Sequence, residues 1–126
     1  MPPARSIAAT TEQRTFQSRP GIIETVMPER ITAAALELTF DNVARLGSGP
    51  LWLVDCTLTV GFETACIAPA AKRFPTMKKD GLRRLVTITP SPAIRMATRA
   101  ATLASGIEVR VVEQRLEAAK FLDLTS

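Results

Sequence analysis

Few residues in this chain have the chemistry that a catalytic site requires. The sequence contains no histidine, which removes the most common general base, the Ser-His and Cys-His pairs and most zinc sites. Cys56 and Cys66 are too far apart for a Cys-x-x-Cys redox or metal motif. No Walker A sequence occurs, and no Gly-x-Gly-x-x-Gly motif follows a strand. We therefore expect a non-catalytic protein without a cofactor or a metal site.

Two acidic residues lie where α/β proteins often bind ligands or partners. Asp55 follows the apolar run Leu51–Val54, and open α/β sheets place ligands at the ends of such strands. An Asp at that place can instead hydrogen-bond to loop amides, so both roles stay open. Glu63 and Thr64 open a helical segment, and the unpaired amides of a helix N-terminus favour an anion. These two residues either cap that helix or belong to an interaction site.

A third group of residues combines arginine with methionine. Arg95 and Arg99 lie one turn apart on an expected helix from Ser91 to Ala104, and Met96 lies beside them. Protein interfaces are enriched in Met and Arg, so these three residues form a candidate interaction surface. The alternative is a solvated Arg pair over a core helix. The basic segment between Lys72 and Arg84 is expected to be a solvated face; the alternatives are contact with an acidic protein partner or with anionic lipid headgroups.

The composition is typical of one globular domain. The chain has 126 residues, of which 46% are hydrophobic and 22% charged. Residues 1–13 are polar and lack the apolar region of a signal peptide, so we expect a flexible tail followed by one domain over 14–126. No apolar run is long enough to insert into a membrane. Two cysteines outside any disulfide pattern favour a reduced, cytoplasmic protein.

The net charge of +4 alone could suit a nucleic acid. The sequence nevertheless has no Tyr and one Trp, so few side chains are present on which bases could stack. We therefore expect no nucleic-acid partner.

Residues 14–126 alternate between strand and helix patterns. Strands over 15–18 and 21–27 flank Pro20-Gly21, a pair suited to a type II turn, which predicts a hairpin. Further strands are expected over 51–55, 82–89 and 107–112, and helices over 32–46, 63–79, 91–104 and 114–122. Pro69 and Pro75 are expected to interrupt or bend the second helix. The order predicts an α/β fold with an N-terminal β-hairpin, then a mostly parallel mixed sheet of about five strands and about four helices.

The helical spacing also predicts which side chains face the core. In the 32–46 helix, Ala35, Leu38 and Leu46 are expected to share the apolar face, with Leu36, Phe40 and Val43 close by. In the 91–104 helix, small and apolar residues suit the sheet-facing side: Ile94, Ala97, Ala101 and Ala104. Small residues at these places would allow the helix to pack closely.

In order and length these elements resemble the STAS family, the domain of bacterial anti-sigma-factor antagonists and sulfate-transporter tails. The resemblance covers Phe16 to Leu122 and rests on the strand Leu51–Asp55, the irregular loop Cys56–Phe62 and a helix opening at Glu63. It implies a STAS-like domain that acts in signalling and regulation through protein–protein interaction. The implied partner is another protein, such as a regulatory kinase or an anti-sigma-like factor, and a homo-oligomer stays open. The alternative is a small-ligand or lipid carrier, which a large apolar cavity beneath the second helix would favour.

The resemblance also bears on a phosphorylation switch. In signalling members of the family this helix opens with Asp-Ser-Ser-Gly, and a partner kinase phosphorylates the second Ser. Here the acid falls on Glu63, the first Ser on Thr64, the acceptor Ser on Ala65 and the Gly on Cys66. Alanine has no hydroxyl, so the resemblance implies a docking surface without the usual serine switch. Thr64 is the fallback phospho-acceptor.

Overall fold

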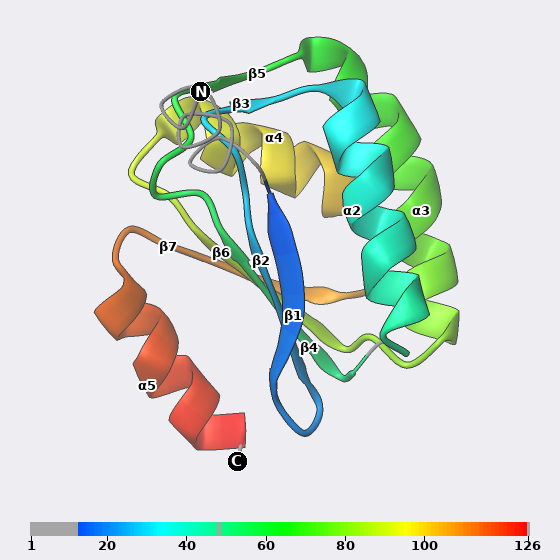
Figure 1. Cartoon of the computed structure of the whole chain (residues 1–126), viewed down its shortest axis with the longest axis vertical. Helices are drawn as coiled ribbons and strands as arrows, with labels where there is room; N and C mark the ends of the chain where they lie inside the picture. Colours follow the sequence, from blue (N-terminus) through cyan, green and yellow to red (C-terminus); the bar gives the residue numbers. More distant parts are fainter. Residues whose placement is uncertain (1–12, 48, 126) are drawn as a thin grey trace, which may run out of the picture.

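A five-stranded sheet forms the centre of the protein (Figure 1). The structure is a computed structural model that describes residues 13–47 and 49–125, with side chains up to Lys120. The strands are β1 (Arg14–Arg19), β2 (Ile22–Val26), β4 (Leu51–Asp55), β6 (Arg84–Ile88) and β7 (Glu108–Val112), and the sheet order is β1-β2-β4-β6-β7. The tail expected over residues 1–13 lies outside the described residues except for Gln13. The predicted mostly parallel α/β sheet is confirmed.

The first two strands form the predicted N-terminal hairpin. β1 pairs antiparallel with β2, whereas β2, β4, β6 and β7 are parallel to their neighbours. Gly21 in the connecting turn has a φ of 82°, which is the left-handed conformation that the second central residue of a type II turn requires. The antiparallel β1 therefore closes one edge of an otherwise parallel sheet.

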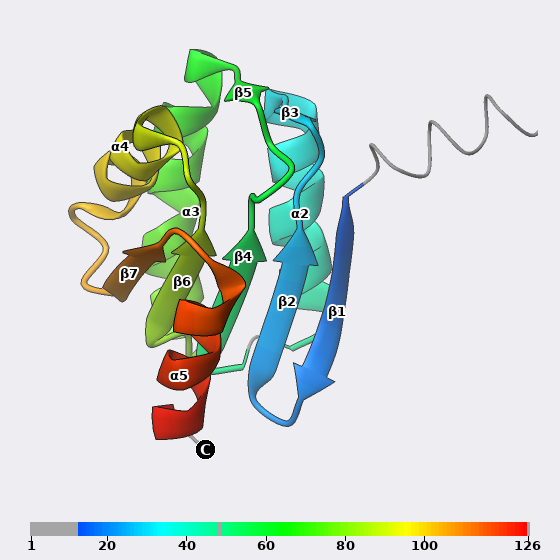
Figure 2. The ribbon, with the colours of Figure 1, turned by 90° about the vertical axis from the view of Figure 1, so that its left-hand side faces the viewer.

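Helices cover both faces of the sheet (Figure 2). α2 (Ala33–Arg45), α3 (Ile67–Lys79) and α4 (Pro92–Thr102) lie on one face, and α5 (Arg115–Thr125) lies on the other. The short 3-10 helix η1 (Thr64–Cys66) leads into α3. Thr32 and Ser91 cap α2 and α4 by accepting hydrogen bonds from the amides of Ala35 and Ile94.

A second, two-stranded sheet was not predicted from the sequence. β3 (Arg30–Ile31) and β5 (Gly61–Phe62) pair in parallel above the carboxyl ends of the main strands. Both strands are short and lie in segments that carry no long apolar pattern, so only their pairing identifies them. β5 forms the end of the segment that we expected to be an irregular loop, Cys56–Phe62.

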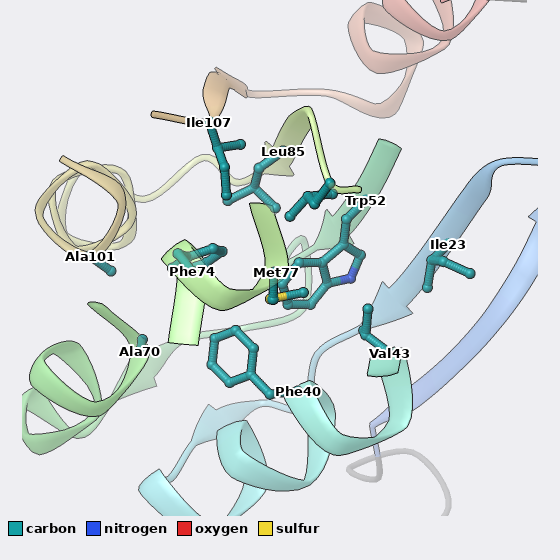
Figure 3. Packing of buried hydrophobic residues seen from close by; sticks show 11 residues of the cluster. Ile23, Phe40, Val43, Trp52, Ala70, Phe74, Met77, Leu85, Ala101 and Ile107 are labelled. Atoms are coloured by element: carbon teal, nitrogen blue, oxygen red, sulfur yellow. The ribbon is translucent and has the colours of Figure 1, made fainter. Parts of the chain in front are cut away.

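Three aromatic side chains form the centre of the main core (Figure 3). The ring of Phe40 on α2 lies edge-on to Trp52 and to Phe74, with centroid distances of 5.6 and 5.3 Å. Trp52 comes from β4 and is buried, and its indole N–H donates a hydrogen bond to the Thr25 hydroxyl at 3.0 Å. The cluster therefore joins the central strand, its neighbour β2 and two helices.

Some details of the helices differ from the sequence-based expectation. Leu38 is 50% exposed, and the residues of α2 that are buried are Thr39, Phe40 and Val43. The prediction for Leu38 was wrong because Phe40, the largest apolar side chain of α2, sets the inward direction by packing on Trp52. Helix α4 ends at Thr102, so Ala104 lies beyond it and is exposed. Pro69 and Pro75 do not interrupt α3, which continues to Lys79.

Two kinds of contact attach α5 to the opposite face of the sheet. Ala118 is completely buried against Leu51, Leu53 and the other apolar residues of that face. At the start of the helix, the Arg115 guanidinium pairs with Glu24 at 2.6 Å and with Asp55 at 3.1 Å. The Glu24 side chain is 8% exposed although it lies on β2 within an apolar face. Glu24 therefore depends on Arg115 for the compensation of its charge.

We expect Arg115→Met to destabilise the protein by about 1–3 kcal/mol, because it leaves the buried Glu24 carboxylate without a cationic partner. The value is below that of a fully buried pair because Arg115 is 53% exposed. Urea denaturation measures the free energy of unfolding. Lys120→Met, a change at an exposed position of the same helix, is the control and should have an effect below about 0.5 kcal/mol. Equal effects of the two substitutions would contradict an anchoring role for Arg115.

Candidate functional site

The carboxyl ends of the parallel strands meet at one edge of the sheet, where the candidate residues gather. β4 ends at Asp55, a loop of residues 56–60 leads to β5, and η1 begins at Thr64. β5 pairs with β3, which places the start of η1 beside the start of α2. The order of the parallel strands thus brings together the loops that the sequence analysis singled out.

Asp55 holds the loop and the last helix. Its Oδ1 accepts hydrogen bonds from the amide of Thr57 at 2.9 Å and from the Thr57 hydroxyl at 2.6 Å. Its Oδ2 accepts a hydrogen bond from Arg115 at 3.1 Å. Of the two roles that the sequence left open, the structure assigns loop binding to Asp55, and both carboxylate oxygens are engaged. Sequence analysis missed Arg115 and Glu24 because no local motif connects residues so far apart in the chain.

Glu63 caps a helix, but not the helix that we expected. Its Oε1 accepts a hydrogen bond from the backbone amide of Ala33 at 2.8 Å, in the first turn of α2. It makes no side-chain cap to η1, although it occupies the N-cap position of that helix. The interpretation of Glu63 as the cap of its own helix was therefore wrong. The β3–β5 pairing is the physical reason, because it brings the free amides of α2 within reach of the carboxylate.

Thr64 and Ala65, the positions of the first Ser and the acceptor Ser in the STAS pattern, are both exposed in η1. Cys66 follows them and is buried, and its Sγ lies 3.7 Å from the carbonyl oxygen of Ile31, to which it donates. The start of η1 thus presents Thr64 and Ala65 to the solvent while Cys66 anchors the turn.

The loop between β4 and β5 exposes two apolar side chains. Leu58 is 62% and Val60 83% exposed, whereas Thr59 between them is buried. The Thr59 hydroxyl donates to the carbonyl oxygen of Pro28 at 2.8 Å, and the amide of Val60 donates to the carbonyl oxygen of Glu29 at 2.7 Å. These bonds turn the loop so that the polar residue points inward and the apolar ones outward. Sequence patterning predicts the opposite orientation, so this surface was missed.

On α4 the expected interaction residues do not have equivalent surroundings. Arg95 lies 3.5 Å from Glu113, in an ion pair with the segment that follows β7. Arg99 is exposed and makes no ion pair with any residue in the described part of the chain, and Met96 is 72% exposed. The outer side of α4 therefore presents one methionine and one unpaired cation. α3 packs against α4, and α4 shares a buried cluster with Cys66 at the end of η1.

An apolar cavity of about 100 Å³ lies between the sheet and the three helices α2, α3 and α4. Its walls include Phe40, Trp52, Ala70, Phe74, Leu85 and Ile94. Sequence patterning predicts apolar positions but not the space left between them, so it could not show whether a cavity exists. The cavity lies beneath α3, which is the place where the small-ligand or lipid-carrier alternative requires one.

Both cysteines are free and buried, so the prediction that they are unbridged is confirmed. Burial raises the pKa of the Cys56 thiol from its ordinary value near 9 to about 12, because removal from water disfavours the thiolate. Burial also raises the pKa of Cys66. Neutral thiols of this kind are poor nucleophiles. Among the described residues, no cluster of three cysteine or acidic side chains could hold a metal ion, and no helix could span a membrane.

We expect the stability of the protein to fall as the pH rises from about 9 towards 12. In this range the Cys56 thiol ionises in the unfolded chain but stays protonated in the native protein, so ionisation favours unfolding by up to about 1.4 kcal/mol per pH unit. Urea denaturation at pH 8 and pH 11 measures this loss for the unsubstituted protein and for Cys56→Ala. The substitution should make the loss smaller. Parallel decreases in the two proteins would contradict a neutral, buried Cys56.

Comparison with known proteins supports the fold expectation. No family profile and no curated protein matches the sequence. One similar solved structure is that of an uncharacterised protein from Shewanella loihica, described as a DUF3478 family member with a SpoIIAA-like fold. The two chains share 16% identity over 88% of this chain and 94% of the other, with a TM-score of 0.64. At this identity the likeness establishes the fold, which is the SpoIIAA-like fold expected from the resemblance to STAS domains.

Proposed function

We propose that this protein is a non-catalytic regulatory module that binds another protein through the carboxyl edge of its sheet. The docking surface is defined as Leu58, Val60, Thr64 and Ala65. The observation that carries the proposal is the exposure of Leu58 and Val60, at 62% and 83%, on a loop whose backbone is held in place by the buried Thr59. A loop already fixed in one conformation loses little entropy on binding, which favours its use in recognition.

The chemistry of this region indicates what kind of partner it fits. Leu58 and Val60 would fill an apolar depression in the partner. Met96 and Arg99 on α4 would form a second contact, because interfaces are enriched in both residue types. Arg95 is paired with Glu113, whereas Arg99 has no ion-pair partner among the described residues, so an acidic residue of the partner would complement Arg99. A regulatory kinase or an anti-sigma-like factor remains the partner class that the STAS-like fold suggests.

A lipid carrier is less well supported than a docking module. Pockets for drug-sized ligands usually measure at least about 300 Å³. The cavity beneath α3 measures about 100 Å³, so a whole lipid does not fit without a large rearrangement of the helices. The cavity is compatible with a much smaller molecule.

We expect Leu58→Asp with Val60→Asp to weaken partner capture at least tenfold, which corresponds to about 1.4 kcal/mol, because charged residues would lose their hydration in the apolar contact. The readout is quantitative mass spectrometry of proteins captured from the source cells, followed by affinity measurement with the purified partner. Leu116→Asp is the matched control, since Leu116 is 68% exposed and lies on α5, on the opposite face of the sheet. Partners retained by the control and lost with the double variant support the proposal.

The same assay separates the loop from α4. Arg99→Ala with Met96→Ala should weaken capture less than the loop variant does, and Lys79→Ala, at an exposed position of α3, should leave it unchanged at moderate salt. All these variants should melt at nearly the same temperature as the unsubstituted protein because the altered side chains are exposed. If capture survives the loop variant and fails with the α4 variant, the docking surface has been assigned to the wrong element.

We further expect the protein to work without the usual serine phosphorylation, because Ala65 occupies the acceptor position. Intact-mass analysis of the protein from its source cells should find the unmodified mass. The exposed Thr64 is the residue to examine by fragmentation, with Thr64→Val as the control. A substantial phosphorylated fraction at Thr64 would restore the switch, with Thr64 in place of the usual serine.

A further inference from the structure

The cavity contains one polar group that has no partner. Thr87 on β6 lines the cavity and is 2% exposed. No residue in the described part of the chain forms a hydrogen bond with the Thr87 hydroxyl. Protein atoms do not enclose the hydroxyl oxygen completely, and the open space beside it is the cavity. An unpaired hydroxyl at this depth is unusual because buried polar groups are nearly always hydrogen-bonded.

The other buried threonines show that this chain normally satisfies such hydroxyls. Each of them takes part in a hydrogen bond: Thr25 with Trp52, Thr39 with Ala35, Thr59 with Pro28, Thr89 with Ser91 and Thr102 with Thr98. Thr98, the second threonine in the cavity wall, donates to the carbonyl oxygen of Ile94 at 2.9 Å. Thr87 is thus the exception among the buried threonines of the described residues.

The remaining wall determines the charge and polarity of an occupant. Apart from Thr87 and Thr98, the lining residues are apolar side chains and the two cysteines. Cys56 and Cys66 are neutral thiols, since burial raises both pKa values. An ion would lose its hydration here without meeting an opposite charge, so the occupant must be neutral.

The volume determines the size of an occupant. A cavity of 150 Å³ lined by aliphatic and aromatic side chains is known to bind benzene, whereas about 15 Å³ is sufficient for one water. At about 100 Å³, the cavity fits one small ring or a short chain, on the order of six non-hydrogen atoms.

We propose that this cavity binds a small, neutral, mostly apolar molecule with one hydrogen-bonding group that pairs with Thr87. A phenol or a short-chain alcohol has this chemistry. The site is separate from the docking surface, so its existence does not depend on the proposed protein partner.

The test uses phenol and benzene as probes, because they differ only in the hydroxyl. Phenol should bind the purified protein and raise its melting temperature in a concentration-dependent manner. Thr87→Val keeps the shape of the side chain and removes the hydroxyl. It should raise the Kd of phenol about tenfold while the Kd of benzene changes less than twofold. Calorimetry and ligand-detected NMR provide the affinities.

A cavity-filling variant provides the second arm. Ala97→Leu places additional carbon atoms in the cavity wall and should abolish the binding of both probes, whereas Ala100→Leu, at an exposed position of the same helix, should leave it unchanged. The absence of binding of either probe to the unsubstituted protein would overturn the proposal. Equal weakening of phenol and benzene by Thr87→Val would overturn the role given to the hydroxyl. Leu58→Asp should not affect either probe, which separates this result from a failure of the docking proposal.

Discussion

The need to bury both faces of β4 is the constraint on which the rest of the structure depends. Leu51 and Leu53 face one side of the sheet, and Trp52 and Val54 face the other. A central strand that is apolar on both sides requires helices on both sides. This need explains why three helices pack over Trp52 and why α5 returns to cover the opposite face. The aromatic contacts of Trp52 with Phe40 and Phe74 then determine how α2 and α3 are oriented.

The two faces satisfy this constraint in different ways. On the Trp52 side, α2, α3 and α4 pack over the sheet, and the side chains there leave the cavity beside Thr87. On the other side a single helix covers the strands. Its one fully buried described side chain, Ala118, is small, and the ion pairs of Arg115 with Glu24 and Asp55 supply the additional attachment. One face is thus held mainly by apolar packing, and the other by packing together with charge.

Parallel strands also collect the functional features at one edge. Asp55 and Glu63 both lie there, but their carboxylates are engaged by Thr57, Arg115 and Ala33, so they position the surface instead of presenting charge to a partner. The exposed residues between them provide the chemistry proposed for docking. The cavity also reaches this end of α3, since Cys66 and Ile67 belong to its wall and follow directly after Ala65. An occupant of the cavity would therefore lie beneath the segment that carries part of the docking surface.

The amino-acid sequence by itself determined the features that depend on neighbouring residues. The Pro20-Gly21 turn, the helix that begins after Ser91 and the apolar strand Leu51–Asp55 could be predicted because each is a matter of local backbone preference or local patterning. Only the tertiary structure decided the contact of Glu63 with Ala33, the Arg115 ion pairs and the outward direction of Leu58 and Val60. These features join segments about 30 or more residues apart, as the 60-residue separation of Asp55 and Arg115 illustrates. The cavity and the unpaired hydroxyl of Thr87 depend on how several helices pack together, and a linear pattern of polar and apolar residues carries no information about the space left between them.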